Sequence, residues 1–567
     1  MGFAGRRKVR IGDILINEGL ISQEALDRAL ELQKIQKKKL GEILVSEGFL
    51  TEEAMADALH HQLGIDRIEL NGIIIPDEII ALFDSDLLKK YRAMPVMYDP
   101  RNLNVIRVAM ADPMDMLALD DLSMVTNRLI DAVVATPREI MMAIDKYYGN
   151  AEALKAASSY EQEREDLFRE DEVERMINDD VNNSPIVQLV NGMLEQAVRQ
   201  RASDIHIEAL EKKVRVRYRI DGALFERITY NIKLLPAIVA RIKITGGMDI
   251  SEKRKPQDGR ITTFVDGKEY DIRVSILPTV FGEKVVMRIT NKNALTVNKS
   301  QLGLGPHESE LFDRILSNPN GIILVTGPTG SGKSTTLYTA LSELNTEDVN
   351  IITVEDPVEA NVNGINQVQT NNKAGLTFAS ALRSILRQDP DIIMIGEIRD
   401  GETAGIAVQA SITGHLVVST LHTNSAASTV TRLEDMGVPS YMIADAVVGI
   451  IAQRLVRRLC PKCKRLKPAS QDELELLGLD EYAEVSIYEP VGCGNCDDSG
   501  FRGRIGVYEI LEVSEGVKKV IAKGGDAEEI KEAALENGMK TLRMCATQYV
   551  LDGITSISEM VKVSFEL

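Results

Sequence analysis

A glycine-rich octapeptide at residues 327–334 carries the strongest chemical signal in this sequence of 567 residues. It reads GPTGSGKS and stands between an apolar, strand-like run at 322–326 and a helical stretch. Glycines let backbone N–H groups close around a phosphate, and the following helix N-terminus adds a positive dipole. In this pattern Lys333 reaches the terminal phosphates of a nucleotide and Ser334 holds Mg²⁺. The predicted nucleotide and Mg²⁺ ligands are Gly327, Pro328, Thr329, Gly330, Ser331, Gly332, Lys333, Ser334 and Thr335.

Acidic residues and histidines follow this loop at the ends of later apolar runs. Glu397 comes directly after the run at 392–395, and Glu355 ends the run in ITVEDPVE. Nucleotide hydrolysis needs a metal organiser, a group that orients water and cations that neutralise the transition state. His415 and His422 flank a third run, in TGHLVVSTLHTN. Each residue alone is compatible with an ordinary solvated side chain, but the ordered series favours a hydrolytic site.

Four cysteines form two C-x-x-C pairs, Cys460 with Cys463 and Cys493 with Cys496, with 29 residues between the pairs. Two such pairs can complete a closed S₄ site, in which zinc supports structure and does not catalyse. The spacer is longer than that of a simple zinc ribbon, and an inserted hairpin would absorb the difference. Redox chemistry is the alternative, but a thioredoxin-type site uses one C-x-x-C in its own context. We therefore predict structural Zn²⁺ and assign Cys545, outside the pattern, to the core.

A 24-residue segment is repeated near the start of the chain. The two copies, at 10–33 and 39–62, are identical at ten positions. Each copy predicts a short helix, a glycine turn and a second helix that begins after Ser22 or Thr51. Two helical hairpins packed on each other explain the periodicity. A cation opens both copies, and glycine and glutamine recur in register, so a ligand with two equivalent halves is the other interpretation.

The remaining sequence predicts a multidomain protein, because one hydrophobic core stops growing well below this length. The α-helical repeat (1–62) precedes an α/β segment (63–150) and a charged linker (151–181). Strand-like alternation in SDIHIEAL and KVRVRYRID predicts an α+β domain at 182–296. Alternating strands and helices then predict an α/β domain with a parallel sheet at 297–567, which includes a cysteine subdomain at 456–500.

Composition narrows the location and the partners of the protein. The formal net charge is −19, from 66 Lys and Arg and 85 Asp and Glu, which disfavours nucleic acid as the main partner. No window approaches the run of about 18 apolar residues that a membrane-spanning helix needs. The basic start is followed by an amphipathic repeat and not by an apolar signal core, so we expect a cytoplasmic protein.

The ordered motifs resemble the ATPases of type II secretion and type IV pilus assembly, over residues 181–567. In this resemblance ITVEDPVE is similar to the Asp box, IIMIGEIRD to the Walker B strand and TGHLVVSTLHTN to the His box, while SDIHIE, RYRIDG, PQDGR and GEKVVMRI match the smaller, PAS-like domain. The resemblance implies a RecA-like motor domain and a homo-hexamer that acts on an inner-membrane platform protein and its cytoplasmic assembly proteins. It also implies ATP and Mg²⁺ as ligands.

Residue roles follow from the same resemblance. Glu397 would be the catalytic carboxylate and Glu355 a second acid near the γ-phosphate, while His415 and His422 would sense the state of the nucleotide. Arg273 and Arg288 of the smaller domain would neutralise phosphate charge. The arginines that would link subunits are Arg383, Arg387, Arg399 and Arg432. Ordinary surface arginines remain the alternative for these last four.

The duplicated segment resembles an N-terminal domain of the MshEN type, which binds cyclic di-GMP through two 24-residue motifs joined by a five-residue spacer. The implied binding residues are Arg10, Gly12, Gln33, Lys39, Gly41 and Gln62. Lys39 departs from the arginine usual in the family, which can form a fork onto guanine or phosphate as lysine cannot.

The tetracysteine subdomain and the N-terminal domain resemble those of assembly ATPases and not of pilus retraction ATPases. We therefore expect an ATPase for type IV pilus extension that cyclic di-GMP regulates, with type II secretion as the alternative. A signal-binding scaffold with a degenerate motor and a nucleic-acid translocase are further alternatives. The intact Lys333, Ser334 and Glu397 disfavour the scaffold, and the acidic charge disfavours the translocase.

Overall fold

The computed structural model describes residues 11–36, 39–149, 184–290, 297–480 and 482–564. Arg10 and the expected linker at 151–181 therefore lie outside the described residues. One compact unit comprises the chain up to Ile261 together with Ile272–Ile289, and the other comprises Thr262–Asp271 and the chain from Thr290. Within the described ranges, no helix combines the length and apolar character that crossing a bilayer requires.

The repeat folds as two helical hairpins, as the sequence predicts. Each second helix begins at a hydroxyl cap, because the Ser22 Oγ accepts the N–H of Ala25 and the Thr51 Oγ1 accepts the N–H of Ala54, both at 3.2 Å. The turns contain Gly19 at φ +70° and Gly48 at φ +76°, in the left-handed region that glycine tolerates. The helices are α1 (Ile11–Asn17), α2 (Gln23–Gln36), α3 (Leu40–Ser46) and α4 (Glu52–Leu63).

A small α/β segment follows the repeat. Its three strands lie in the order β1-β2-β3, with β1 and β2 antiparallel and β2 and β3 parallel. The strands are β1 (Ala93–Asp99), β2 (Asn102–Met110) and β3 (Leu129–Val134). The helices are α5 (Asp77–Ile80), α6 (Ser85–Tyr91), α7 (Met116–Thr126) and one at 137–149.

The next domain has six strands in the order β6-β5-β4-β9-β8-β7, and SDIHIEAL and KVRVRYRID supply β4 and β5 as expected. Apolar side chains of α9 and α10 pack with those of the strands in one core. The helices are α9 (Pro185–Arg199) and α10 (Leu235–Thr245). The strands are β4 (Ala202–Ala209), β5 (Lys213–Ile220), β6 (Ala223–Asn231), β7 (Gln257–Val265), β8 (Lys268–Thr279) and β9 (Gly282–Thr290).

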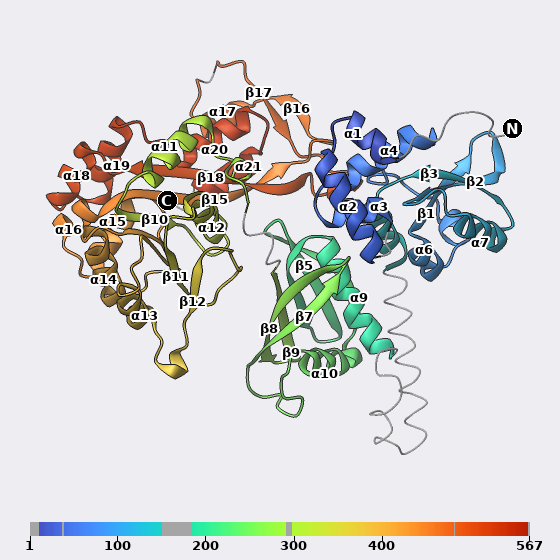
Figure 1. The fold of residues 1–567 in the computed structure, drawn as a ribbon, viewed down its shortest axis with the longest axis horizontal. Helices are drawn as coiled ribbons and strands as arrows, with labels where there is room; N and C mark the ends of the chain where they lie inside the picture. The colour runs from blue at the N-terminus through green and yellow to red at the C-terminus, as the bar shows by residue number, and fades with distance from the viewer. Residues whose placement is uncertain (1–10, 37–38, 150–183, 291–296, 481, 565–567) are drawn as a thin grey trace. The chain divides into compact units, whose positions relative to one another are not determined.

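The largest sheet has seven strands in the order β12-β11-β13-β14-β10-β15-β18 (Figure 1). All neighbours run parallel except β18, which is antiparallel to β15. The strands are β10 (Gly321–Thr326), β11 (Ile351–Glu355), β12 (Asn366–Gln369), β13 (Ile392–Ile395), β14 (Leu416–Leu421), β15 (Val447–Leu459) and β18 (Phe501–Glu512). The carboxyl ends of β10, β13 and β14 therefore meet at one edge of the sheet, where open α/β sheets bind their ligands.

Helices cover both faces of this sheet. Ile322 and Leu324 of β10 belong to one core with residues from α13 to α16, α18 and α19, whereas Ile323 and Val325 belong to another with α11 and α12. These helices are α11 (Pro306–Leu316), α12 (Lys333–Leu344), α13 (Phe378–Ile385), α14 (Gly401–Ile412), α15 (Ala427–Asp435), α16 (Ser440–Ala446), α18 (Glu515–Ala522) and α19 (Ala527–Glu536). This alternation explains why β10 is a continuous apolar run in the sequence.

The segment between the two cysteine pairs contains the hairpin that the spacer predicts, together with one helix. Strands β16 (Arg465–Pro468) and β17 (Ser486–Glu489) pair antiparallel, and α17 (Gln471–Leu477) joins them. Its apolar residues pack with those of the last two helices, α20 (Leu542–Leu551) and α21 (Ile557–Ser564). Cys545 is 7% exposed in this core, as expected from the sequence.

Candidate nucleotide-binding and metal sites

The glycine-rich loop leaves the carboxyl end of β10 and enters α12, which is the strand, loop and helix context that the motif requires. Gly327, Gly330 and Gly332 have φ values of +148°, +82° and +91°. At Gly327 a Cβ would lie 2.5 Å from the carbonyl oxygen of Gln453, so no side chain fits there. Glycine is therefore needed both for the backbone conformation and for the close approach of β15.

Lys333 begins α12 and points its amine back over the loop. Its Nζ donates to the carbonyl oxygens of Gly327 at 2.7 Å and Pro328 at 3.2 Å. Partial burial lowers the pKa of Lys333 to about 8, while the carboxylate of Glu397 acts in the opposite direction. A nucleotide phosphate at this position would provide the counter-charge that the amine lacks.

Glu397 and His422 lie beside this lysine, at the ends of β13 and β14. The His422 Nδ1 is 3.5 Å from the Lys333 Nζ, and its Nε2 is 3.6 Å from the Glu397 Oε2. The other carboxylate oxygen of Glu397 accepts a hydrogen bond from Arg399 at 2.5 Å. Three residues that sequence motifs nominated from separate segments therefore meet at the phosphate loop.

Glu355 ends β11 in a more enclosed position. The side chain is 4% exposed and accepts hydrogen bonds from the hydroxyl groups of Tyr338 at 2.5 Å and Thr353 at 2.7 Å. The amide of Gln367 donates a third bond at 3.1 Å. Burial and this hydrogen bond to Glu355 raise the pKa of Tyr338. Glu355 is thus held as a fixed acceptor, and its role as a second acid stays a prediction.

His415 lies at the opposite end of β14 from His422. Its Nδ1 is 2.9 Å from the carbonyl oxygen of Ala410, and its own carbonyl accepts the N–H of Gly321, the first residue of β10. Because the six residues of β14 lie between them, the two histidines are separated by about 23 Å along the strand. The structure does not bring His415 to the phosphate loop, and its sensing role stays a prediction.

The nominated arginines lie on several elements. Arg288 of β9 donates to Asp204 at 3.2 Å, and Arg273 is half-buried on β8. Arg383 of α13 bonds Glu402, whereas Arg387 donates to the carbonyl of Arg383 at 2.8 Å. Arg432 is exposed on α15. Their proposed contacts to phosphates or to other subunits remain predictions.

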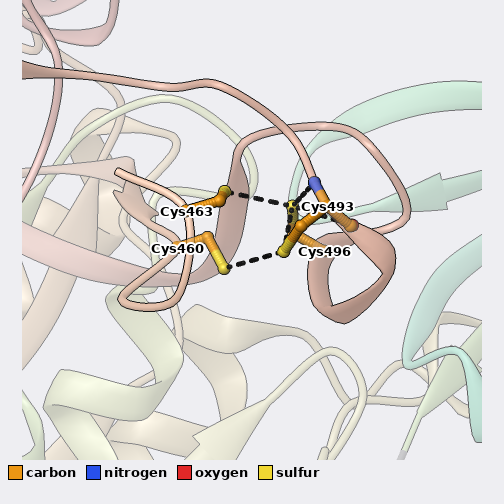
Figure 2. A group of neighbouring side chains, drawn as sticks. All are labelled: Cys460, Cys463, Cys493 and Cys496. Atoms are coloured by element: carbon orange, nitrogen blue, oxygen red, sulfur yellow. Dashed lines mark hydrogen bonds between the residues drawn. The ribbon is translucent and has the colours of Figure 1, made fainter. Parts of the chain in front are cut away.

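The four cysteines converge (Figure 2). Sulfur to sulfur distances are 3.9 Å for Cys460 and Cys493, 3.8 Å for Cys463 and Cys496, and 3.8 Å for Cys493 and Cys496. Cys460 follows the last residue of β15, and Cys496 lies just before β18. These separations are far beyond disulfide bonds, so all four residues are free thiols.

The cysteine geometry fits a zinc ion. A tetrahedral site with Zn–S bonds of about 2.3 Å has sulfur to sulfur edges of about 3.8 Å. The Sγ of Cys496 also accepts backbone N–H groups from Gly500 at 3.2 Å and Cys493 at 3.3 Å. Burial raises the pKa of this thiol, and these two hydrogen bonds act in the opposite direction. The residues present would fill all four positions, so a metal held here has no place for substrate.

In the repeat, the recurrent glycines permit close helix packing. A Cβ on Gly12 would lie 3.0 Å from the Leu26 Cδ1, and one on Gly41 would lie 2.6 Å from the Met55 Cε. Leu26 and Met55 occupy equivalent positions of the two copies. Lys39 forms an ion pair with Asp112. Gln33 and Gln62 lie near the ends of α2 and α4. Whether any of these residues contacts a ligand stays a prediction.

The sequence analysis nominated neither of two residues that support the phosphate loop. Gln453 is 2% exposed on β15, and its side-chain oxygen accepts the hydroxyl of Thr336 at 2.7 Å. The Thr423 Oγ1 lies 2.6 Å from that of Thr326, the residue before the loop. The available signal was a glutamine within the apolar run VVGIIAQRLV, because a polar side chain in a buried strand requires a partner.

Comparison with known proteins identifies the family of the chain. Residues 179–562 match the family model described as type II/IV secretion system protein, and residues 63–154 match the MshEN domain. The type IV pilus assembly ATPase PilB of Myxococcus xanthus is 44% identical over 97% of this chain and 98% of that protein. The type II secretion system protein E of Pseudomonas aeruginosa is 45% identical over 75% of this chain and 82% of that protein.

A solved structure shares the fold. The Legionella pneumophila ATPase DotB is 23% identical, with a TM-score of 0.50 over 69% of this chain and 99% of that one. The family model matches most of the chain, at residues 179–562. The Myxococcus xanthus relative aligns along nearly the whole chain, and its 44% identity is high enough to indicate a common family. The chain belongs to the type II/IV secretion system protein family.

Proposed function

We propose that this protein is an ATP-hydrolysing motor for type IV pilus assembly. The observation that carries the proposal is the meeting of Lys333, Glu397 and His422 at the mouth of a phosphate loop. Similarity to a pilus assembly ATPase along nearly the whole chain supports the choice of process. The acidic net charge agrees with a protein partner in preference to nucleic acid.

The loop residues would bind the nucleotide and its metal. Backbone N–H groups of the loop and the amine of Lys333 would hold the phosphates, and the hydroxyl of Ser334 would hold Mg²⁺. The bound Mg²⁺ neutralises phosphate charge. Glu397 would orient and deprotonate the attacking water once its bond to Arg399 opens, and His422 would report whether a terminal phosphate is present.

Further parts of the site would come from the assembly. We propose a homo-hexamer in the cytoplasm that acts on a membrane platform protein, with the nominated arginines as the groups that complete the site. Arg273 and Arg288 would neutralise phosphate charge, since such cations contribute about 10³ or more to rate in related chemistry. Arg383, Arg387, Arg399 and Arg432 would link subunits.

Two further ligands belong to this proposal. The sulfur geometry supports structural Zn²⁺ at Cys460, Cys463, Cys493 and Cys496. The MshEN match and the duplicated hairpins support regulation by cyclic di-GMP at the N-terminal domain. Arg10, Gly12, Gln33, Lys39, Gly41 and Gln62 are the candidate contacts.

Type II secretion is the second candidate function. Two proteins named type II secretion system protein E are 45% and 46% identical to the chain, over 75% and 68% of its length. These identities are as high as that of the pilus assembly ATPase from Myxococcus xanthus. The two kinds of relative differ in how much of this chain aligns with them.

Complementation separates the two processes. The gene is expressed in a strain that lacks its pilus assembly ATPase and in one that lacks its type II secretion ATPase, each beside the Lys333→Ala variant. We expect surface pilin to return in the first strain only, and only with Lys333 intact. Restored secretion without pili would replace the pilus function by the secretion function.

A further inference from the structure

Strand β15 brings an arginine beneath the phosphate loop. Thr326, the last residue of β10, pairs with Ala452 of β15, so Gln453 and Arg454 lie level with the start of the loop. Arg454 is only 5% exposed. A buried guanidinium is uncommon because its desolvation costs free energy, and it therefore calls for a reason.

The guanidinium of Arg454 hydrogen-bonds one loop of the site and lies beside the other. Its Nη2 donates to the carbonyl oxygen of Asn424 at 3.0 Å and lies 3.3 Å from the Asn424 side-chain oxygen. Its Nη1 donates to the carbonyl of Gln453 at 3.1 Å and lies 3.2 Å from where a Cβ on Gly327 would be. Arg454 thus fills the space between the phosphate loop and the loop at 422–425.

The loop at 422–425 has a second attachment to the end of β10. The N–H of Thr423 donates to the Thr326 Oγ1 at 2.9 Å. The hydroxyl groups of Thr423 and Thr429 also form a hydrogen bond, with their oxygens 2.7 Å apart. His422 lies directly before this anchored stretch. Its position near Lys333 and Glu397 therefore depends on how firmly residues 423 and 424 are held.

Arg454 also contributes charge to the site. Burial is the main reason that the pKa of Lys333 falls, and the nearby positive charge of Arg454 lowers it further. A guanidinium keeps its proton at any physiological pH, so this charge is permanent. Charges interact more strongly in a partly buried site than in water. The two cations repel each other in the free protein. Phosphates that fill the loop would attract both of them and offset this repulsion.

We propose that Arg454 is a positioning residue of the nucleotide site, which holds the His422 loop to β15 beside the phosphate loop and adds fixed positive charge behind the phosphates. The inference rests on the proposed ATPase function and names a residue that none of the sequence motifs includes. Its two effects are separable, because the fork that bonds Asn424 through Nη2 and the Gln453 carbonyl through Nη1 needs a guanidinium, whereas the charge needs only a cation.

Two variants of Arg454 in the full-length protein test the proposal. Arg454→Lys keeps the charge and loses the fork, so we expect ATP affinity close to the wild type and kcat lower by about 10-fold. Arg454→Met loses both, and we expect ATP affinity to fall by about 10-fold as well, which is the effect of one partly screened charge. Arg458→Met is the matched control, because Arg458 is exposed on the same strand.

Calorimetric titration with ATP, steady-state hydrolysis and thermal unfolding are measured for each protein. Wild-type affinity and turnover in folded Arg454→Met would overturn the inference, and so would an equal loss of ATP affinity in the Lys and Met variants. Thr423→Val removes the side-chain hydroxyl that attaches the same loop to Thr326 and Thr429. We expect lower kcat at unchanged ATP affinity in this variant. Absence of ATP binding by the wild type would instead refute the proposed function itself.

Discussion

The Nε2 atom of His422 lies 3.6 Å from the Oε2 atom of Glu397, although the two residues follow different strands. The other oxygen of that carboxylate is bonded to Arg399, and the other ring nitrogen faces Lys333 at 3.5 Å. Glu397 is therefore surrounded by basic groups on its own chain. Binding of a nucleotide at Lys333 must rearrange this set before the carboxylate can approach a water molecule.

Removal of the Glu397 charge should separate binding from hydrolysis. We expect Glu397→Gln to lower ATP turnover by about 10²-fold or more, because the amide cannot accept a proton from water. ATP binding should persist, since Lys333 and the loop remain. Malachite-green phosphate release and calorimetric ATP titration measure the two effects. Near-normal hydrolysis would remove Glu397 from the catalytic role, and Glu343→Gln on the exposed end of α12 is the control.

Nucleotide binding should take up protons at mildly alkaline pH. The pKa of Lys333 is lowered to about 8 in the free protein, so the amine loses its proton as pH rises through 8. Phosphate raises the pKa of the lysine again, and ATP affinity should therefore fall between pH 8 and 9.5. Titrations at pH 8.5 in buffers of different ionisation enthalpy measure the uptake.

The same shift has a consequence for stability. The folded pKa of Lys333 is below its ordinary value of 10.5, so the unfolded chain binds more protons between pH 8 and 10.5. This group alone therefore makes stability rise with pH in that window, and its cost is fully present below pH 8. The side chain of the Lys333→Arg variant stays charged over this range. If proton uptake on ATP binding is unchanged in this variant, a group other than residue 333 is responsible for the uptake.

The cysteine cluster should hold one zinc ion per chain. We expect elemental analysis to find it and Cys460→Ser to lose it, with a marked fall in the temperature of unfolding, since structural zinc contributes about 10 kcal/mol or more in small sites. Cys545→Ala is the control, because that thiol lies in the apolar core beside the hairpin and does not belong to the cluster of four sulfurs. A folded protein that contains no metal would exclude the S₄ site.

The N-terminal domain should bind cyclic di-GMP with both halves of its repeat. Lys39 is 68% exposed, so its ion pair with Asp112 is weak and easily exchanged for a ligand. We expect Arg10→Ala and Lys39→Ala to weaken binding by about 10-fold each, and Lys39→Arg to strengthen it through a bidentate contact. ATP affinity should not change. Lys34→Ala, at an exposed position near the end of α2, is the control. Calorimetry that finds equal affinities for all variants contradicts the assignment.

Local features of the site could be predicted from the sequence. The loop at 327–334 is specified by its own glycines, and the strand ends at Glu397 and His422 follow from short apolar runs, so their convergence needs only the parallel order of β10, β14 and β13. The hairpin between the cysteine pairs was likewise predictable from the spacer length. In these cases the deciding interactions lie within a few residues of the motif.

Other features depend on contacts between distant segments. Arg454 supports the loop from a strand more than 100 residues away, and its neighbours Arg457 and Arg458 look the same in the sequence. His415 belongs to the same motif as His422, but the direction of β14 carries it to the far edge of the sheet. The close packing of the repeat glycines Gly12 and Gly41 against Leu26 and Met55 was not apparent from the sequence, and their ligand contacts stay a prediction.

The position of the cysteines at the open end of β15 and β18 has a consequence for folding. A slip of one residue in this antiparallel ladder would turn every side chain of a strand to the opposite face. Gln453 would then leave the phosphate loop, and Cys460 would move by about 3.3 Å relative to Cys496, too far for a tetrahedral ion. A metal ion held by the cysteines would therefore favour the one register of β15 and β18 in which Gln453 supports the nucleotide-binding loop.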